Sequence, residues 1–136
     1  MSMDIILSTN TNNPRLELGG ITRFRDGSGF ESHLVVVSGG FSAEHPFYFE
    51  EPVLASFVKA LESMDQSLKG EDKLKPLFED DYIELVMSSG GHVIVRGEMF
   101  ECAEESQHLE FSFVTDQTCL TPLIGDLKKC SQMATT

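Results

Sequence analysis

Cysteine occurs only three times in this 136-residue chain, and lysine and arginine together occur only ten times. The cysteines, Cys102, Cys119 and Cys130, are odd in number and far apart, which fits neither a disulfide framework nor a zinc knuckle. The chain also lacks an apolar run approaching the roughly eighteen residues that a membrane helix needs. Residues 1–8 lack the basic and long hydrophobic regions of a signal peptide. We therefore expect a cytoplasmic protein without a membrane span or a cleaved signal.

The shortage of basic residues is accompanied by an excess of acidic ones. Twenty-two Asp and Glu residues give a formal net charge of -12. Because nucleic-acid affinity comes largely from Lys and Arg that neutralise phosphates, we expect no DNA or RNA partner. Twelve of the acids lie in the segments 44–51, 79–84 and 98–110, which contain no Lys or Arg. Such regional charge can attract a basic partner or serve solubility alone, and the sequence leaves both interpretations open.

The length and the 40% of apolar residues indicate one globular domain over residues 1–136, with residues 1–14 and 131–136 partly flexible. Alternating and β-branched segments separated by Gly-rich turns predict strands. One β meander is expected between Ile5 and Phe49, and a second between Ile83 and Phe113.

The register of one hairpin can be predicted from its own residues. A three-residue loop over 89–91 pairs Leu85 with Val95 and places Glu84 opposite Arg96. A one-residue slip would turn Arg96 toward the apolar side of the sheet, so this register is favoured.

Between the meanders, apolar residues recur at helical spacing. Pro52 suits the first turn and Gly70 offers a left-handed cap. The residues of this apolar stripe are Val53, Leu54, Phe57, Val58, Leu61, Met64 and Leu68. A second, short helix is expected near the C-terminus, beginning at Asp116 or Thr121. The predicted fold is α+β, with six to seven strands in one antiparallel sheet, one long amphipathic helix packed on it and a short C-terminal helix.

No catalytic motif is recognisable. The segment 40–44 lacks the last glycine of a nucleophile elbow, and the glycine pairs do not begin phosphate-binding loops. The four histidines, at positions 33, 45, 92 and 108, do not have the spacing of metal ligands. We expect Cys119 to be a half-buried structural thiol. No catalytic, cofactor-binding or metal-ligating residue is therefore predicted.

The order of features from residue 47 onward is more informative than any single one. The ordered features are Phe47-Tyr48-Phe49-Glu50-Glu51, a helix with Phe57 and Leu61, the exit Leu68-Lys69-Gly70-Glu71 with Leu74, the Gly91-His92-Val93 hairpin, and a strand over 109–118 that ends in Asp116-Gln117-Thr118 before Leu120. Over residues 47–127 this order resembles the WapI-type immunity proteins. The resemblance implies a cytoplasmic protein that binds and neutralises the toxic C-terminal domain of a cognate bacterial toxin, often a nuclease. It brings no catalytic residue with it.

The first functional hypothesis is therefore a non-enzymatic inhibitor with an acidic binding surface, because a nuclease must be basic to hold its substrate. The expected partner-binding residues are Glu79, Asp80, Asp81, Glu84, Glu98, Glu101, Glu104, Glu105 and Glu110, with Tyr82 or Phe100 as an aromatic anchor. One alternative is a small-molecule binding domain with a cavity between helix and sheet and His92 or His108 as its polar group. Another is an adaptor or secretion chaperone. The oligomeric state stays open, with a monomer favoured.

Overall fold

The computed structural model describes residues 2–9, 11–102 and 106–134. Within these ranges the elements follow one another as β1 (Met3–Ser8), β2 (Arg15–Arg23), β3 (Gly29–Ser38), β4 (Phe41–Glu50), α1 (Glu51–Ser67), β5 (Glu71–Leu74), β6 (Tyr82–Ser88), β7 (His92–Cys102), β8 (Ser106–Asp116) and α2 (Leu120–Ser131). Two 3-10 turns, η1 (Ser89–Gly91) and η2 (Gln117–Cys119), precede β7 and α2. No helix in this described part of the chain combines the length and apolar character that a membrane crossing requires.

The strands form two antiparallel sheets of four strands, in the orders β1-β2-β3-β4 and β5-β6-β7-β8. The α+β class and the two meanders are confirmed, but the prediction of a single sheet of six to seven strands is wrong. A single sheet of eight strands would be about 38 Å wide, whereas two helices cover about 20 Å. When two sheets pack with their apolar faces against each other, both faces are buried and the helices need not cover them.

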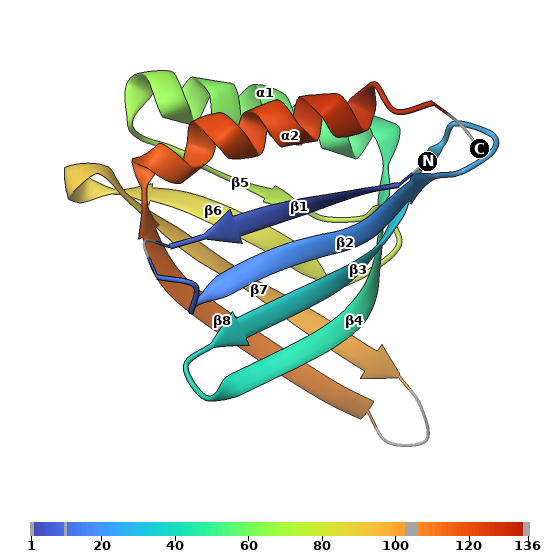
Figure 1. Cartoon of the computed structure of the whole chain (residues 1–136), viewed down its shortest axis with the longest axis horizontal. Helices are drawn as coiled ribbons and strands as arrows, with labels where there is room; N and C mark the ends of the chain where they lie inside the picture. Colours follow the sequence, from blue (N-terminus) through green and yellow to red (C-terminus); the bar gives the residue numbers. More distant parts are fainter. Residues whose placement is uncertain (1, 10, 103–105, 135–136) are drawn as a thin grey trace.

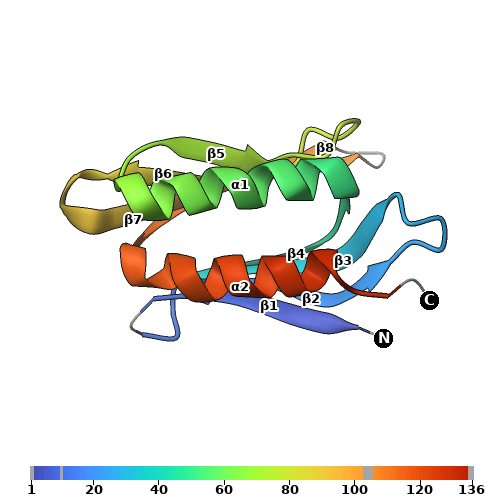
Figure 2. The same ribbon diagram turned by 90° about the horizontal axis from the view of Figure 1, so that it is seen from above.

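The two helices lie side by side along one open side of this sandwich (Figures 1 and 2). Helix α1 contacts the edge strand β5, α2 contacts the edge strand β1, and the two helices contact each other. Helix α1 has 17 residues, and α2 has 12 and follows directly on the three residues of η2. The expected contrast between a long helix and a short C-terminal one is therefore wrong. Both helices are needed, because each covers the outer strand of a different sheet.

One continuous core joins the two sheets and the helices. The stacked rings of Phe30 and Phe49, 5.3 Å apart, occupy it from the first sheet, and Leu54 and Leu61 enter it from α1. Leu85 enters it from the second sheet, and all five side chains are almost fully buried. Five of the seven residues of the predicted apolar stripe are buried in α1, namely Leu54, Phe57, Val58, Leu61 and Met64. Val53 is partly buried, whereas Leu68 lies just beyond the helix and is 48% exposed.

Local signals explain most of the element boundaries. In the β6–β7 hairpin, Leu85 pairs with Val95 and Glu84 with Arg96, so the predicted register is confirmed. Asp116 begins the C-terminal helical segment, because its carboxylate accepts a hydrogen bond from the Thr118 N–H at 2.9 Å.

The end of α1 differs from the sequence prediction. The left-handed cap is Leu68, with φ of 58°, and its N–H donates to the Met64 carbonyl at 2.8 Å. Gly70, which was expected to supply the cap, lies two residues later with φ of 111°.

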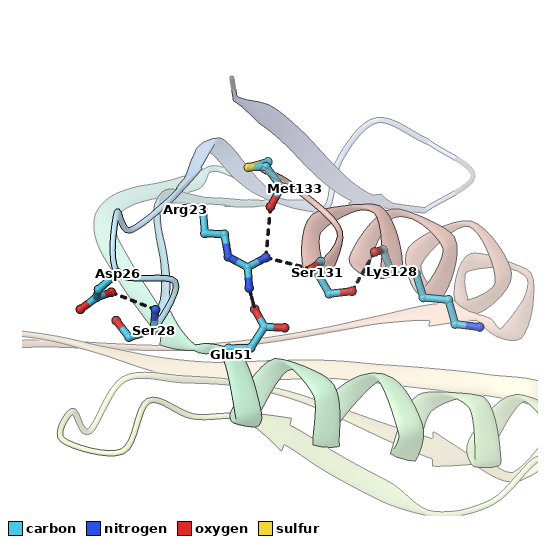
Figure 3. Close-up of polar contacts among 7 residues, drawn as sticks. All are labelled: Arg23, Asp26, Ser28, Glu51, Lys128, Ser131 and Met133. Carbon is cyan, nitrogen blue, oxygen red and sulfur yellow. Dashed lines mark hydrogen bonds and ion pairs between the residues drawn. The ribbon is translucent and has the colours of Figure 1, made fainter. Parts of the chain in front are cut away.

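A partly buried arginine connects the helices to the first sheet (Figure 3). Arg23, at the end of β2, donates from Nη2 to the Glu51 carboxylate at 2.6 Å, at the start of α1. Its Nη1 donates to the backbone carbonyls of Ser131 and Met133 at 2.9 and 3.1 Å, at the end of α2. The same guanidinium lies 5.1 Å from the centre of the Phe30 ring. Three segments that are distant in the sequence therefore share one cation.

Candidate partner-binding surface

Five of the eleven predicted binding residues, Tyr82, Glu84, Glu98, Phe100 and Glu110, come from one face of the second sheet. In β7 the side chains of Val93, Val95 and Met99 are buried, so the alternate residues point away from the core. We call this side the outer face. Its members are Glu71 and Lys73 of β5, Tyr82, Glu84 and Val86 of β6, Ile94, Arg96, Glu98 and Phe100 of β7, and His108, Glu110, Ser112 and Val114 of β8.

Glu98 is at the centre of a polar cluster on the outer face. Its two carboxylate oxygens contact the Tyr82 hydroxyl, which donates at 3.0 Å, and Nε2 of His108, also at 3.0 Å. Burial raises the pKa of Tyr82, and the hydrogen bond to the negative Glu98 raises it further, so Tyr82 stays a protonated donor. The Nζ of Lys73 lies 4.6 Å from the centre of the Tyr82 ring. This part of the face is therefore ordered by its own contacts.

Phe100 and His108 lie on neighbouring strands and stack on each other. Their ring centres are 4.4 Å apart and the ring planes differ by 5°. The stack holds the His108 ring in the orientation in which Nε2 reaches Glu98. Phe100 is only half-buried and Tyr82 likewise, so both predicted anchors are already packed or hydrogen-bonded within the protein.

Glu84 does not contribute a free charge. Its side chain is nearly buried, and it accepts a hydrogen bond from Nε of Arg96 at 2.5 Å. That hydrogen bond and the Glu84 charge raise the pKa of Arg96, and Nη2 of Arg96 also lies 4.0 Å from Glu71. The two charges compensate each other across the β6–β7 pair, so the expected role of Glu84 in the negative field is not supported by its environment.

Asp81 is also internal. It is 6% exposed, its carboxylate lies 3.2 Å from Nε2 of His45 in β4, and it accepts the Phe100 N–H at 2.9 Å. Its position between β4 and β7 makes it a bridge between the two sheets. Such a carboxylate stabilises the fold and offers little charge to a partner.

Four of the predicted acids remain exposed, namely Glu79, Asp80, Glu101 and Glu110. Glu104 and Glu105 lie outside the described residues. Within the described ranges, none of the four exposed acids forms an ion pair with Lys, Arg or His. Glu110 is the cross-strand neighbour of Glu98 on the outer face. Glu101 follows Phe100 at the end of β7 and points to the opposite side of that strand, and Glu79 and Asp80 lie in the loop before β6. This arrangement is the negative surface that remains after internal pairing.

Several residues of this region were missed by the sequence prediction. Strand β5 has four residues, three of them charged, so it has no apolar alternation that would reveal Glu71 and Lys73 on the outer face. No role was predicted for Leu77 and Phe78, which the loop over residues 75–81 exposes to solvent. The sequence did contain a hint of this exposure, because Leu77 and Phe78 fit neither the helical nor the alternating pattern that marks core positions.

The histidines and cysteines of the described ranges are the remaining candidates for metal binding or catalysis. His92 and His108 lie on the outer face and point away from the interface between helices and sheets, where Leu54, Leu61, Leu120 and Leu127 fill the space. In the described ranges, no three His, Cys, Asp or Glu side chains are grouped to hold a metal ion. Burial raises the pKa of Cys119 to about 11 and that of Cys130 to about 12, which keeps both free thiols protonated.

Comparison with known proteins identifies the family. The model of the family described as the immunity protein WapI-like family matches residues 5–133, from β1 to the end of α2. The match extends well beyond residues 47–127, over which the resemblance is visible in the sequence. A comparison with curated proteins finds no match. The chain belongs to the WapI-like immunity protein family.

Proposed function

We propose that this protein is a non-enzymatic cytoplasmic inhibitor that binds the toxic domain of a cognate bacterial toxin and neutralises it. Membership of the immunity protein family supports the toxin-neutralising role. The proposed partner is a basic, nuclease-like domain, and the proposed contact surface is the outer face together with the adjoining loop 75–81 and the exposed end of β7 at Glu101. The proposed partner-binding charges are those of Glu79, Asp80, Glu101 and Glu110.

The observation that supports this surface most strongly is the set of four exposed carboxylates that the fold leaves without ion pairs. The chain has enough cations to compensate some of its acids, and Arg96 and Lys128 do so for Glu84 and Glu62. Among the residues that the structure describes, no Lys, Arg or His forms an ion pair with Glu79, Asp80, Glu101 or Glu110. A clustered negative field accelerates the approach of a basic protein and disfavours acidic partners. The same field repels nucleic acid.

The alternative of a small-molecule site is less well supported by these positions. It required His92 or His108 beside a cavity between helix and sheet, and both side chains are on the opposite side of the second sheet. The adaptor or chaperone alternative predicts a dimer, because chaperones of that kind are usually dimeric. Sedimentation of the purified protein separates this alternative from the inhibitor.

The test uses the toxic domain encoded beside this chain's gene, purified in an inactivated form. Reversing two exposed charges of the surface, Glu101→Lys with Glu110→Lys, should slow association about tenfold or more and flatten its dependence on salt. The matched control reverses Glu17 and Glu31 on the outward side of the first sheet, with the same change in net charge. Stopped-flow association at 50 and 300 mM salt measures both variants. Equal association rates for the two double variants would remove this surface from the proposal.

A further inference from the structure

Phe78 is the most exposed large apolar residue of the described chain, with 91% of its surface open to solvent, and its neighbour Leu77 is 62% exposed. Both belong to loop 75–81 between β5 and β6. Single exposed apolar residues are common on protein surfaces, so exposure alone assigns no role. The way the rest of the loop is held, and the charges beside it, provide the further evidence.

The loop is fixed at several points. Nζ of Lys75 donates to the Glu79 carbonyl at 2.8 Å, which closes the loop on itself. The Leu77 N–H donates to the Glu50 carboxylate at 3.1 Å, at the junction of β4 and α1. At the end of the loop, Asp81 joins β4 and β7 as described above. Phe78 is therefore presented on an ordered support, so a partner would not have to order the loop on binding.

The surroundings of the loop have the chemistry of a site for a basic partner. Glu79 and Asp80 follow Phe78 directly and are exposed. Beside them a hollow of about 180 Å³ is lined by Glu79, Asp81, His45 and Tyr48, and by Pro46 and Pro76. Tyr48 is 43% exposed. A Lys or Arg side chain entering this hollow would meet the carboxylate of Glu79 and the face of an aromatic ring.

Loop 75–81 also adjoins the proposed contact surface. The Asp81–Phe100 hydrogen bond places the end of the loop against β7 at the Phe100–His108 stack. An anchor on this loop and the exposed acids of the outer face can therefore contact the same partner.

We propose that Phe78, supported by Leu77, is the hydrophobic anchor of the complex and inserts into an apolar pocket of the toxic domain rimmed by Lys or Arg. The proposal rests on the proposed function, since the occupant is the toxin. In such a complex the apolar anchor determines the rate of dissociation, and the acids of Glu79 and Asp80 determine the rate of association and the orientation. The sequence candidates Tyr82 and Phe100 then support the anchor without being inserted.

The test compares Phe78→Ala with Phe41→Ala. Phe41 is 82% exposed at the start of β4, so both substitutions remove an exposed ring and should leave the thermal unfolding temperature unchanged. With the inactivated toxic domain as the probe, Phe78→Ala should increase the dissociation rate at least about tenfold, and Phe41→Ala should change it less than about twofold. The Glu79→Gln, Asp80→Asn double variant should slow association and leave dissociation nearly unchanged.

The outcomes separate this proposal from the one on which it depends. If the wild-type protein does not bind the toxic domain at all, the proposed function fails. If the wild-type protein binds and Phe78→Ala dissociates at the wild-type rate, only the anchor proposal is overturned. If the wild-type protein alone sediments as a dimer and Phe78→Ala as a monomer, Phe78 binds a second copy of this chain, which also overturns the proposal.

Discussion

The Asp81 carboxylate lies 3.2 Å from Nε2 of His45 and thereby joins the two sheets at the edge opposite the helices. His45 is an inward residue of β4, in register with the fully buried Leu34. Asp81 precedes β6 and also accepts the N–H of Phe100 from β7. No strand of one sheet pairs with a strand of the other in the described ranges. This side-chain bridge therefore supplies a polar connection that the backbone does not.

We predict that Asp81→Ala lowers the free energy of unfolding by about 1–3 kcal/mol, because it leaves the Phe100 N–H and the His45 ring without their acceptor. Urea unfolding followed by circular dichroism measures the change. Asp80→Ala is the control, since this neighbouring carboxylate is exposed and its loss should change stability by less than about 0.5 kcal/mol. Equal stability of the two variants would show that the bridge is not stabilising.

The fold could be predicted from the sequence as far as local signals reach. Alternation and turn residues identified the strands around Leu85 and Val95 in their observed register. The number of sheets could not be predicted in this way, because strand periodicity indicates which face of a meander is apolar but not what covers that face. Strand β5 was not predicted for another reason, because only one of its four residues, Leu74, is apolar and buried.

The candidate site could be predicted as a region but not as a set of free charges. The sequence indicated the acids of the second meander, and those that the structure describes lie on the outer face, in loop 75–81 or at the end of β7. Whether an acid is free depends on tertiary contacts, and Asp81 is paired by a histidine 36 positions earlier in the chain. Glu84 shows the opposite case, because its pairing with Arg96 followed from the predicted register although its burial did not.

Arg23 gives a second stability prediction. Arg23→Ala leaves the Glu51 carboxylate and the carbonyls of Ser131 and Met133 without their shared donor, in a partly buried site (Figure 3). We expect a loss of about 2 kcal/mol in the free energy of unfolding. Hydrogen exchange should also accelerate in the last turn of α2 before it does in the sheets. Arg25→Ala, at an exposed position two residues later, is the control and should leave both measurements unchanged.

The thiols of Cys119, which is half-buried, and of Cys130, which is buried, predict how reactivity and stability depend on pH. Burial raises the pKa of Cys119 to about 11 and of Cys130 to about 12, with the charges of Asp116 and Glu51 adding to the effect. In a Cys102→Ser background, a thiol-specific disulfide reagent at pH 8 should label neither cysteine in the folded protein and both in guanidinium chloride. Rapid labelling of the folded protein would contradict the burial of these side chains.

The raised pKa values of the two cysteines also predict that the protein becomes less stable at alkaline pH. Both pKa values are higher in the folded than in the unfolded protein, so the folded state keeps its thiol protons to higher pH. Their contribution to stability is complete below about pH 9, the ordinary thiol value, and is lost as the pH rises toward 11 and 12. Urea midpoints should therefore fall between pH 9 and 11. A variant in which Cys119 and Cys130 are both replaced by Ala should show a smaller fall, whatever its absolute stability.

Two glycines should respond to alanine with opposite signs. A Cβ on Gly97, in β7, would overlap the Tyr82 carbonyl oxygen and lie 2.8 Å from Cζ of Phe111. Gly97→Ala should therefore force β6 away from β7 and cost at least about 2 kcal/mol. A Cβ on Gly125, inside α2, would meet no atom within 4 Å, and its replacement should stabilise the helix by about 0.5–1 kcal/mol.

The Gly97 variant also connects stability to the proposed function. Gly97 precedes Glu98, and Tyr82 is the cross-strand partner of Glu98, so a displaced β6 would separate the Tyr82 hydroxyl from the Glu98 carboxylate. We expect Gly97→Ala to weaken binding of the toxic domain at temperatures where the variant is still folded, whereas Gly125→Ala binds as the wild-type protein does. Calorimetric titration of both variants, at a temperature well below the unfolding transition of Gly97→Ala, measures this difference. Wild-type affinity in the folded Gly97→Ala protein would show that the partner does not depend on the geometry of the Tyr82–Glu98 pair.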